Sequence, residues 1–111
     1  MGYIYHITTK SDWADAQKIG YYSPEGFASE GFIHFSKQEQ VAATAARYYS
    51  TVPELIVLKV DMGKLKAEIK TEQAPNGDWY PHLYGILNMD AVENVISLQA
   101  EQDGTFRFEG N

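Results

Sequence analysis

Residues 55–61 constrain the fold of this chain more than any other segment. The side chains of Ile56, Leu58 and Val60 alternate onto one face of an extended strand, while apolar residues between them partly cover the other face. A strand that is apolar on both faces has to be covered on both sides. The pattern therefore predicts a strand in the centre of a sheet.

Weaker strand patterns lie before and after this segment. Residues 3–8 alternate between two faces, and the aromatic segment 79–87 has no decisive period. Asp103-Gly104 ahead of Phe106 and Phe108 predicts a hairpin. The further expected strands are residues 3–8, 31–35, 67–72 and 95–99.

Two segments carry helix signals. Ser11 is a good N-cap, and apolar residues at helical spacing lead from it to Gly20, which suits the left-handed position after a helix. Ser36 and Glu39 match a capping box, so a second helix is expected to begin there and to end before Pro53. Loops are expected at residues 21–30 and 74–78, and Asp90 is expected to cap a short helical turn.

The order strand, helix, strand, helix and then mainly strands predicts an α+β domain over residues 1–111. We expect a curved, mostly antiparallel sheet of five or six strands with two flanking helices. The length of 111 residues and the hydrophobic content of 44% fit one compact domain.

Composition excludes several classes of function. The formal net charge is −6 and the only arginines are Arg47 and Arg107, so we expect no sequence-general binding to nucleic acid. The absence of cysteine excludes disulfides, thiolate catalysis and cysteine-ligated zinc. Neither a signal sequence nor an apolar run of membrane-spanning length is present, so we expect a soluble cytoplasmic protein without membrane contact.

The three histidines, His6, His34 and His82, each lie in an aromatic, strand-like stretch. A ring in such a setting is either a hydrogen-bonded core residue or part of the wall of a cleft. We expect at least two of the three rings to lie within roughly 10 Å of each other in one cleft, a span that a small ligand bridges. No pair has the short spacing typical of zinc ligands, so no metal is expected.

Three motifs follow one another along the chain: Tyr5-His6-Ile7, then Gly31-Phe32-Ile33-His34-Phe35-Ser36 followed by a glutamine-rich helix start, and Pro81-His82-Leu83-Tyr84-Gly85. Taken together and in this order, they resemble the bacterial family called domain of unknown function 952 over nearly the whole chain. The fold of that family is similar to that of ADP-ribosyltransferases and RNA 2'-phosphotransferases. The resemblance implies a split, curved β core with a cleft between its halves, and an enzyme acting on NAD or an ADP-ribose-like group.

The resemblance also implies roles for particular residues. His6 matches a histidine that binds a ribose of NAD, and Phe32, His34 and Ser36 match an aromatic strand that stacks nicotinamide. A glutamate that orients the nucleophile corresponds to either Glu72 or His82. The candidate catalytic residues are therefore His6, His34, Glu72 and His82, and the candidate ligand-binding residues are Tyr5, Thr8, Phe32, Ser36 and Tyr84.

Physical reasoning leaves other interpretations open. A helix beginning at Ser36, with Lys37 beside it, favours a phosphate, whereas the acidic charge of the chain opposes one. The capping box favours Ser36 as a helix cap over a nucleophile, while His6 is equally explained as a core histidine bonded to a backbone carbonyl and Glu72 as a solvated carboxylate.

Two other functions fit the sequence. A non-catalytic module that binds a nucleotide or another small ligand would keep the cleft without the chemistry, and the lack of a plain glutamate motif favours it. A partner-binding protein would use exposed aromatic residues at an interface, for which Tyr21, Tyr22 and Trp79 are candidates. Tyr48 and Tyr49 are expected to pack in the core.

Overall fold

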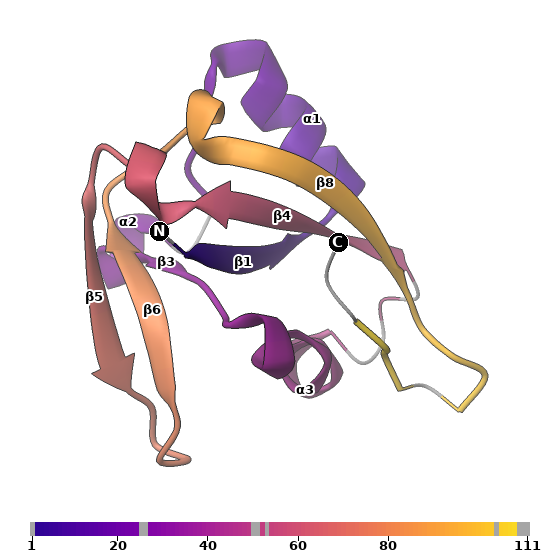
Figure 1. The fold of residues 1–111 in the computed structure, drawn as a ribbon. Coiled ribbons are helices and arrows are strands. Elements are labelled where there is room, and N and C mark those ends of the chain that lie inside the picture. The colour runs from indigo at the N-terminus through magenta and orange to yellow at the C-terminus, as the bar shows by residue number, and fades with distance from the viewer. Residues whose placement is uncertain (1, 25–26, 50–51, 53, 104, 109–111) are drawn as a thin grey trace.

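The computed structural model describes residues 2–24, 27–49, 52, 54–103 and 105–108. Its strands are β1 (Tyr3–Thr8), β2 (Tyr21–Tyr22), β3 (Ile33–His34), β4 (Glu54–Asp61), β5 (Glu68–Gln73), β6 (Trp79–Tyr84), β7 (Leu87–Asn88) and β8 (Val92–Gln99). Its helices are α1 (Lys10–Ile19), α2 (Phe27–Glu30) and α3 (Val41–Tyr48), with short 3-10 turns η1 (Gln38–Gln40), η2 (Met62–Lys64) and η3 (Met89–Ala91). Figure 1 shows how these elements are arranged.

The strands form three sheets in which every pairing is antiparallel. Their strand orders are β1-β4-β8, β2-β7 and β3-β6-β5. β4 lies in the middle of the first sheet, which confirms the prediction from its two apolar faces. In Figure 1, β5 and β6 extend downward as a hairpin at one side of the first sheet, and α3 lies below that sheet.

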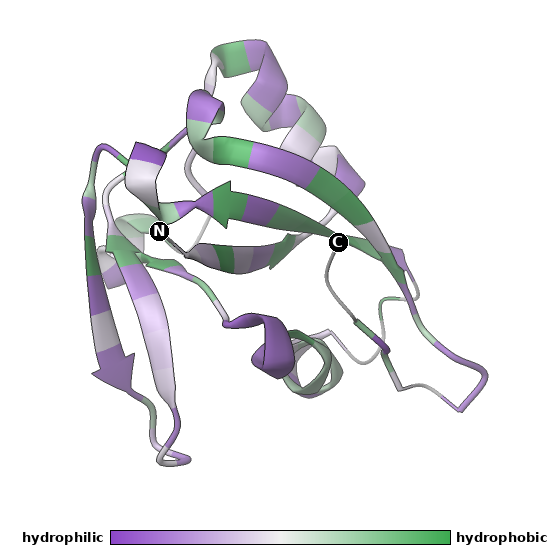
Figure 2. Cartoon of the chain, viewed as in Figure 1, coloured by the Kyte–Doolittle hydropathy of each residue, from purple (hydrophilic) through white to green (hydrophobic). Residues whose placement is uncertain are grey.

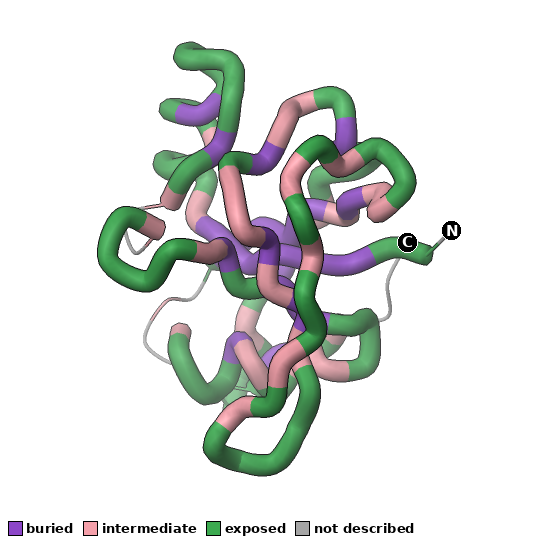
Figure 3. The backbone as a smooth tube through the Cα atoms, turned by 90° about the vertical axis from the view of Figure 1, so that its left-hand side faces the viewer, coloured by how far each residue is buried: buried purple, intermediate pink, exposed green. Residues whose placement is uncertain are grey.

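Two hydrophobic clusters cover the two faces of β4. One contains Leu58 together with Ile33 and Leu83 of the β3-β6-β5 sheet. The other contains Leu55 together with Val41 of α3. The buried parts of the chain consequently cross the middle of the molecule (Figure 3), while the outer parts of β5 and β6 are mostly hydrophilic (Figure 2).

The predicted α+β class and antiparallel pairing are confirmed, but the predicted element counts are wrong. The described residues form eight strands and three α-helices, where five or six strands and two helices were expected. Part of the difference lies in residues 21–30, which were expected to be a loop. Tyr22 pairs with Leu87 and is buried, and α2 follows it.

Both predicted helix starts are wrong. The cap of α1 is Thr9, whose Oγ1 accepts a hydrogen bond from the Asp12 N–H at 3.1 Å, and Ser11 lies inside the helix. Gly20 does end α1 in the left-handed region, with φ of 91°. Ser36 and Glu39 form no capping box, because the backbone of Ser36 pairs with the edge of β1.

Two smaller predictions were close to the structure. Two others involve residues that the structure does not describe. Asn88, not Asp90, precedes the short turn η3, and its Nδ2 donates to the Asp90 carboxylate at 2.6 Å. The expected hairpin near the C-terminus closes with a bridge between Ala100 and Phe106. Pro53 and Gly104 lie outside the described residues.

Within the part of the chain that is described, no helix has the length and apolar character needed to cross a membrane.

The β3-β6-β5 sheet joins the β1-β4-β8 sheet at the edge of β1. Ser36 donates its N–H to the Tyr5 carbonyl at 2.7 Å and accepts the Tyr5 N–H at 2.8 Å. The strand expected over residues 31–35 is thus only two residues long, and its continuation crosses to β1. This crossing places the outer face of the β3-β6-β5 sheet next to the end of β1.

Candidate functional site

The outer face of the β3-β6-β5 sheet gathers aromatic and ionisable side chains. His34 and His82 are direct neighbours across β3 and β6, and since their neighbours Ile33 and Leu83 are in the core, the two histidines face outward. The ring centroids of His34 and His82 are 5.1 Å apart. Phe32 stacks on His82 with centroids 4.2 Å apart and an angle of 20° between the ring planes.

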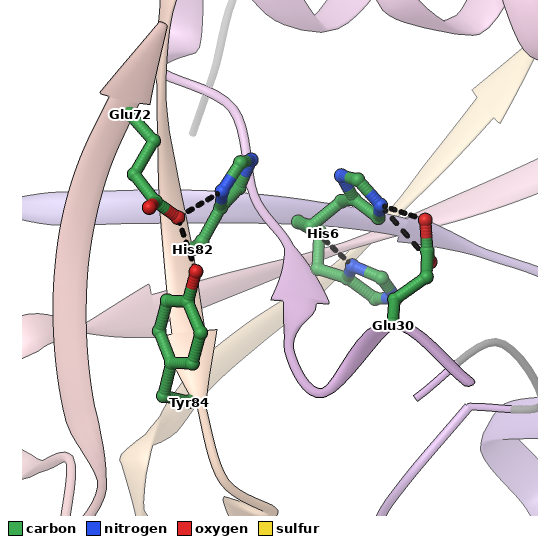
Figure 4. A network of polar contacts seen from close by, with 6 residues as sticks. His6, Glu30, Glu72, His82 and Tyr84 are labelled. Atoms are coloured by element: carbon green, nitrogen blue, oxygen red, sulfur yellow. Dashed lines mark hydrogen bonds and ion pairs between the residues drawn. The ribbon is translucent and has the colours of Figure 1, made fainter. Parts of the chain in front are cut away.

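Glu72 connects this aromatic cluster to β5. Its Oε1 accepts hydrogen bonds from Nδ1 of His82 at 2.8 Å and from the Tyr84 hydroxyl at 2.5 Å (Figure 4). The bond from Tyr84, and then the bond from His82, lower the pKa of Glu72 below its ordinary value. The same bond raises the pKa of Tyr84. Glu72 is therefore ionised at neutral pH, with a side chain that is still 40% exposed.

His34 forms a second pair of a histidine with a carboxylate. Its Nε2 lies 3.1 Å from each carboxylate oxygen of Glu30, the last residue of α2. The His34 side chain is 58% exposed. Figure 4 shows Glu30 of this pair together with the group formed by Glu72, His82 and Tyr84.

His6 lies beneath His34 and is buried. Because a carbonyl only accepts, Nδ1 of His6 donates to the His34 carbonyl oxygen at 2.5 Å, and Nε2 lies 2.8 Å from the Tyr22 hydroxyl. The Tyr22 hydroxyl lies 2.9 Å from Oγ1 of Thr8. Burial lowers the pKa of His6 from 6.5 to about 4, so the ring is neutral at pH 7. These are the contacts of a core histidine that holds the backbone of β3 against β1.

Two adjoining cavities open around His6 and His34. One has a volume of about 280 Å³ and is lined by aromatic residues such as Phe27 and Phe32. The other has a volume of about 430 Å³ and lies between the end of β1 and the end of α3. The linings of both include His6, Glu30, His34 and Tyr49. The pair Glu30–His34 therefore lies where the two cavities meet.

The two parts of the expectation about the histidine rings fall on different pairs. The rings of His34 and His82 have the expected separation, whereas His6 and His34 share the cavities. His82 is not one of the described residues that line either cavity.

The remaining candidate residues are divided between the cluster and the core. Phe32 and Tyr84 belong to the aromatic cluster, with centroids 5.2 Å apart. Thr8 lines the smaller cavity. Tyr5 and Ser36 line the larger one, although both are almost fully buried. Oγ of Ser36 donates to Oγ1 of Thr44 at 3.3 Å, so this hydroxyl links the segment after β3 to α3.

Sequence reasoning missed three residues at this site. Glu30 is four positions before His34, but this spacing indicates a pairing only within a helix, and here α2 ends at Glu30 while His34 lies on β3. Tyr48 was assigned to the core, but it is 70% exposed and lines the larger cavity. Arg47 precedes it and has its guanidinium carbon 6.0 Å from the Tyr48 ring centroid. The helix start that was expected at Ser36 lies one residue later, where Lys37 precedes η1.

Two further features of the structure concern the expected aromatic interface and a possible metal site. Tyr22 is buried and cannot form part of an interface, whereas Tyr21 and Trp79 are exposed. In the described ranges, no three His, Cys, Asp or Glu side chains are grouped so that they could hold a metal ion.

Comparison with known proteins supports the family and the fold. Residues 7–95 match the model of a family described as "Protein of unknown function (DUF952)". The chain belongs to the DUF952 family. The matched range includes Glu72 and the two histidines of the outer face, together with Glu30.

The fold of this DUF952 chain is similar to that of solved structures of protein CC0527 from Caulobacter crescentus. A crystal structure is 30% identical, with a TM-score of 0.85, and the match covers 95% of this chain and 93% of that one. A solution NMR structure is 31% identical, with a TM-score of 0.81, and the match covers 95% of this chain and 91% of that one. None of the curated proteins matches the DUF952 chain by sequence.

Proposed function

We propose that this DUF952 protein is a nucleotide-handling enzyme of the ADP-ribosyltransferase type, which acts on NAD or an ADP-ribose-like group. The observation that carries the proposal is the ionised carboxylate of Glu72, held by His82 and Tyr84 beside an aromatic cluster. The split arrangement of small antiparallel sheets is consistent with the ADP-ribosyltransferase-like fold that the sequence motifs imply.

Glu72 has the charge that cleavage of an N-glycosidic bond requires. When the bond between the ribose C1′ and the nicotinamide nitrogen breaks, its electron pair leaves with nicotinamide and positive charge develops on the ribose. A fixed anion next to that carbon stabilises the transition state more than the ground state. Hydrogen bonds from Tyr84 and His82 keep Glu72 ionised and fix the position of its carboxylate.

His82 is suited to take the proton of the incoming nucleophile. Its Nδ1 carries a hydrogen because it donates to the ionised Glu72, so a neutral ring has its lone pair on Nε2. A water or acceptor hydroxyl that forms the new bond to C1′ would pass its proton to this nitrogen. Phe32 and His34 offer the flat surfaces against which a nicotinamide or a base stacks.

The role we assign to His6 differs from the role implied by family resemblance. Both of its ring nitrogens are engaged inside the protein, one by the His34 carbonyl and the other by Tyr22. We therefore treat His6 as a positioning residue that fixes β3 and, through it, the ring of His34.

Binding and cleavage are tested separately. Calorimetry with NAD and with ADP-ribose measures binding, and chromatography of released nicotinamide measures cleavage. His34→Ala should weaken binding without unfolding the domain, since its side chain is exposed. Glu72→Gln keeps the shape but removes the charge, so it should keep the affinity and lower the rate of cleavage by roughly 100-fold or more. Absence of heat with either ligand, or equal affinity after His34→Ala, would exclude the proposal.

A non-catalytic binding module is the second candidate function. It is favoured by the internal pairing of both carboxylates, since Glu30 and Glu72 are each bonded to a histidine. A wild-type protein that binds NAD or ADP-ribose but releases no nicotinamide would support this alternative. If neither ligand binds, the exposed Tyr21 and Trp79 make a partner-binding surface the next hypothesis.

A further inference from the structure

Glu30 places a carboxylate where the two cavities around His34 meet. Its side chain lines both cavities and is 46% exposed. Asp12 adds a second carboxylate to the smaller cavity, and the described residues that line the two cavities include neither lysine nor arginine. This part of the cleft therefore suits neutral groups that donate hydrogen bonds, and it opposes a phosphate.

The backbone around Glu30 is fixed at both ends of α2. Phe27, the first residue of α2, packs against the first hydrophobic cluster. Gly31 follows Glu30, donates its N–H to the Phe27 carbonyl at 2.7 Å, and has a φ of 83°, in the left-handed region that favours glycine. The chain then enters β3, which brings His34 beside Glu30. The carboxylate is thus positioned without a ligand, so little ordering is needed on binding.

The contact with His34 uses only part of the Glu30 carboxylate. One N–H of the His34 ring is shared between the two oxygens, each 3.1 Å from Nε2. An ionised carboxylate has about four lone-pair sites, so both oxygens keep the capacity to accept from a ligand. Two hydroxyl groups on neighbouring carbons, such as the 2′- and 3′-hydroxyls of ribose, donate to such a pair of oxygens. Carboxylates bind ribose hydroxyls in this way in dinucleotide-binding folds.

The larger cavity has room for the base attached to that ribose. Its volume of about 430 Å³ lies in the range of small-molecule sites. Ile7 of β1 and two tyrosines, Tyr48 and Tyr49, contribute apolar surface to its lining. Aromatic and aliphatic side chains of this kind pack against the flat face of a purine. A nucleoside is consequently accommodated with its base in the larger cavity and its ribose at Glu30.

We propose that Glu30 binds the 2′,3′-diol of the adenosine ribose, and that this contact selects NAD and ADP-ribose over their 2′-phosphorylated forms. A 2′-phosphate removes one of the two donors and places negative charge against the carboxylate. The inference rests on the proposed function in taking an adenine ribonucleotide as the ligand, but it requires no bond to be cleaved. Glu30 is thereby a specificity-determining residue, separate from the catalytic role proposed for Glu72.

ADP, 2′-deoxy-ADP and ADP with an added 2′-phosphate are the probes that test this contact. They share the base and the diphosphate and differ at the 2′ position, so calorimetry at constant ionic strength isolates the diol. The wild type should bind ADP roughly tenfold or more tightly than either analogue. Equal affinity for ADP and its 2′-phosphorylated form, or no binding of ADP, would overturn the inference.

Glu30→Gln and Glu101→Gln form a matched pair of variants. Each replaces a half-exposed carboxylate by an amide, with exposed fractions of 46% and 49%, and Glu101 pairs with Arg107 and lines neither cavity. Glu30→Gln should weaken ADP binding by roughly tenfold and abolish the discrimination against the 2′-phosphate. Glu101→Gln should change both by less than about twofold. Circular dichroism checks that each variant is folded.

Glu30→Asp separates the charge of this residue from its reach. Aspartate keeps the negative charge but is shorter by one methylene group, so this variant should bind ADP less tightly and still reject the 2′-phosphate. If Glu30 only held His34 in place, Glu30→Gln would weaken the binding of all three probes by the same factor. That result, with the discrimination retained, would contradict the inference.

Release of nicotinamide separates this inference from the proposed function. Equal release from NAD and from its 2′-phosphorylated form would overturn the role of Glu30 and leave the enzyme proposal standing. Selective binding of ADP that is lost in Glu30→Gln, without release of nicotinamide from NAD, would support the role of Glu30 and exclude the enzyme proposal.

Discussion

At the residue scale, three histidines in similar sequence settings have three different environments. His6 is buried with both ring nitrogens bonded, His34 is exposed beside Glu30, and His82 is bonded to Glu72. The aromatic surroundings indicated a site or a core for each of them and could not separate the two. What separates them is the strand on which each lies and the face to which it points, and both depend on pairing with distant strands.

The buried His6 predicts a loss of stability in mild acid. The folded protein binds a proton on His6 near pH 4 and the unfolded chain near pH 6.5, so the unfolded state takes up more protons between these values. Stability contributed by neutral His6 is therefore fully present above pH 6.5 and falls as the pH is lowered toward 4. The total loss is on the order of 3 kcal/mol.

Urea unfolding at a series of pH values measures this loss. His6→Asn removes the titrating group, so the difference in free energy of unfolding between the wild type and this variant should shrink as the pH falls from 6.5 to 4. His34→Asn, at an exposed position, serves as the control and should follow the wild type. A constant difference between wild type and His6→Asn across this range would contradict the burial of a neutral ring.

At the element scale, sequence patterns identified the long strands and helices. They missed the short strands, which depend on pairing with distant strands, and the N-cap of α1, which depends on a single residue. The apolar alternation of β4 and the glycine after α1 were sufficient to place both elements. The two-residue strands β2 and β3 are too short to show a period, and they exist because β7 and β6 pair with them. Ser11 and Thr9 are both good caps, and the backbone selects Thr9.

The identity of the α1 cap is open to a direct test. Thr9→Ala removes the oxygen that accepts the Asp12 N–H, and it should lower the free energy of unfolding by about 1 kcal/mol. Ser11→Ala is the matched control, since it lies within the helix where alanine is favoured, and it should change stability by less than about 0.5 kcal/mol. Thermal or urea unfolding of both variants measures these values. A larger loss of stability from Ser11→Ala than from Thr9→Ala would show that Ser11, as predicted from the sequence, is the N-cap of α1.

At the scale of the whole molecule, the candidate site depends on contacts that no local pattern encodes. Glu72 and His82 meet because β5 pairs with β6, and His34 joins them because β3 pairs with the other edge of β6. The sequence supplied most of the site residues, but their division into a cluster, a core histidine and two cavities required the sheet order.

The two core clusters predict that the molecule unfolds as one unit. β4 contributes Leu58 to one cluster and Leu55 to the other, and both side chains are fully buried. Leu58→Ala and Leu55→Ala should each lower the free energy of unfolding by about 2–5 kcal/mol, since each removes buried volume from a packed core. Ile19→Ala, at an exposed position on α1, is the control and should have an effect below about 0.5 kcal/mol.

Two spectroscopic probes show whether the loss is shared by the whole domain. Trp13 on α1 packs against the first cluster and Trp79 lies on β6, so tryptophan fluorescence reports on two distant parts of the molecule, and far-ultraviolet circular dichroism reports on the backbone. Because β4 connects both clusters through one strand, the transitions seen by the two methods should coincide in every variant. Separate transitions in Leu55→Ala, with fluorescence and circular dichroism changing at different urea concentrations, would show that the α3 side of the sheet unfolds independently of the side that supports the candidate site.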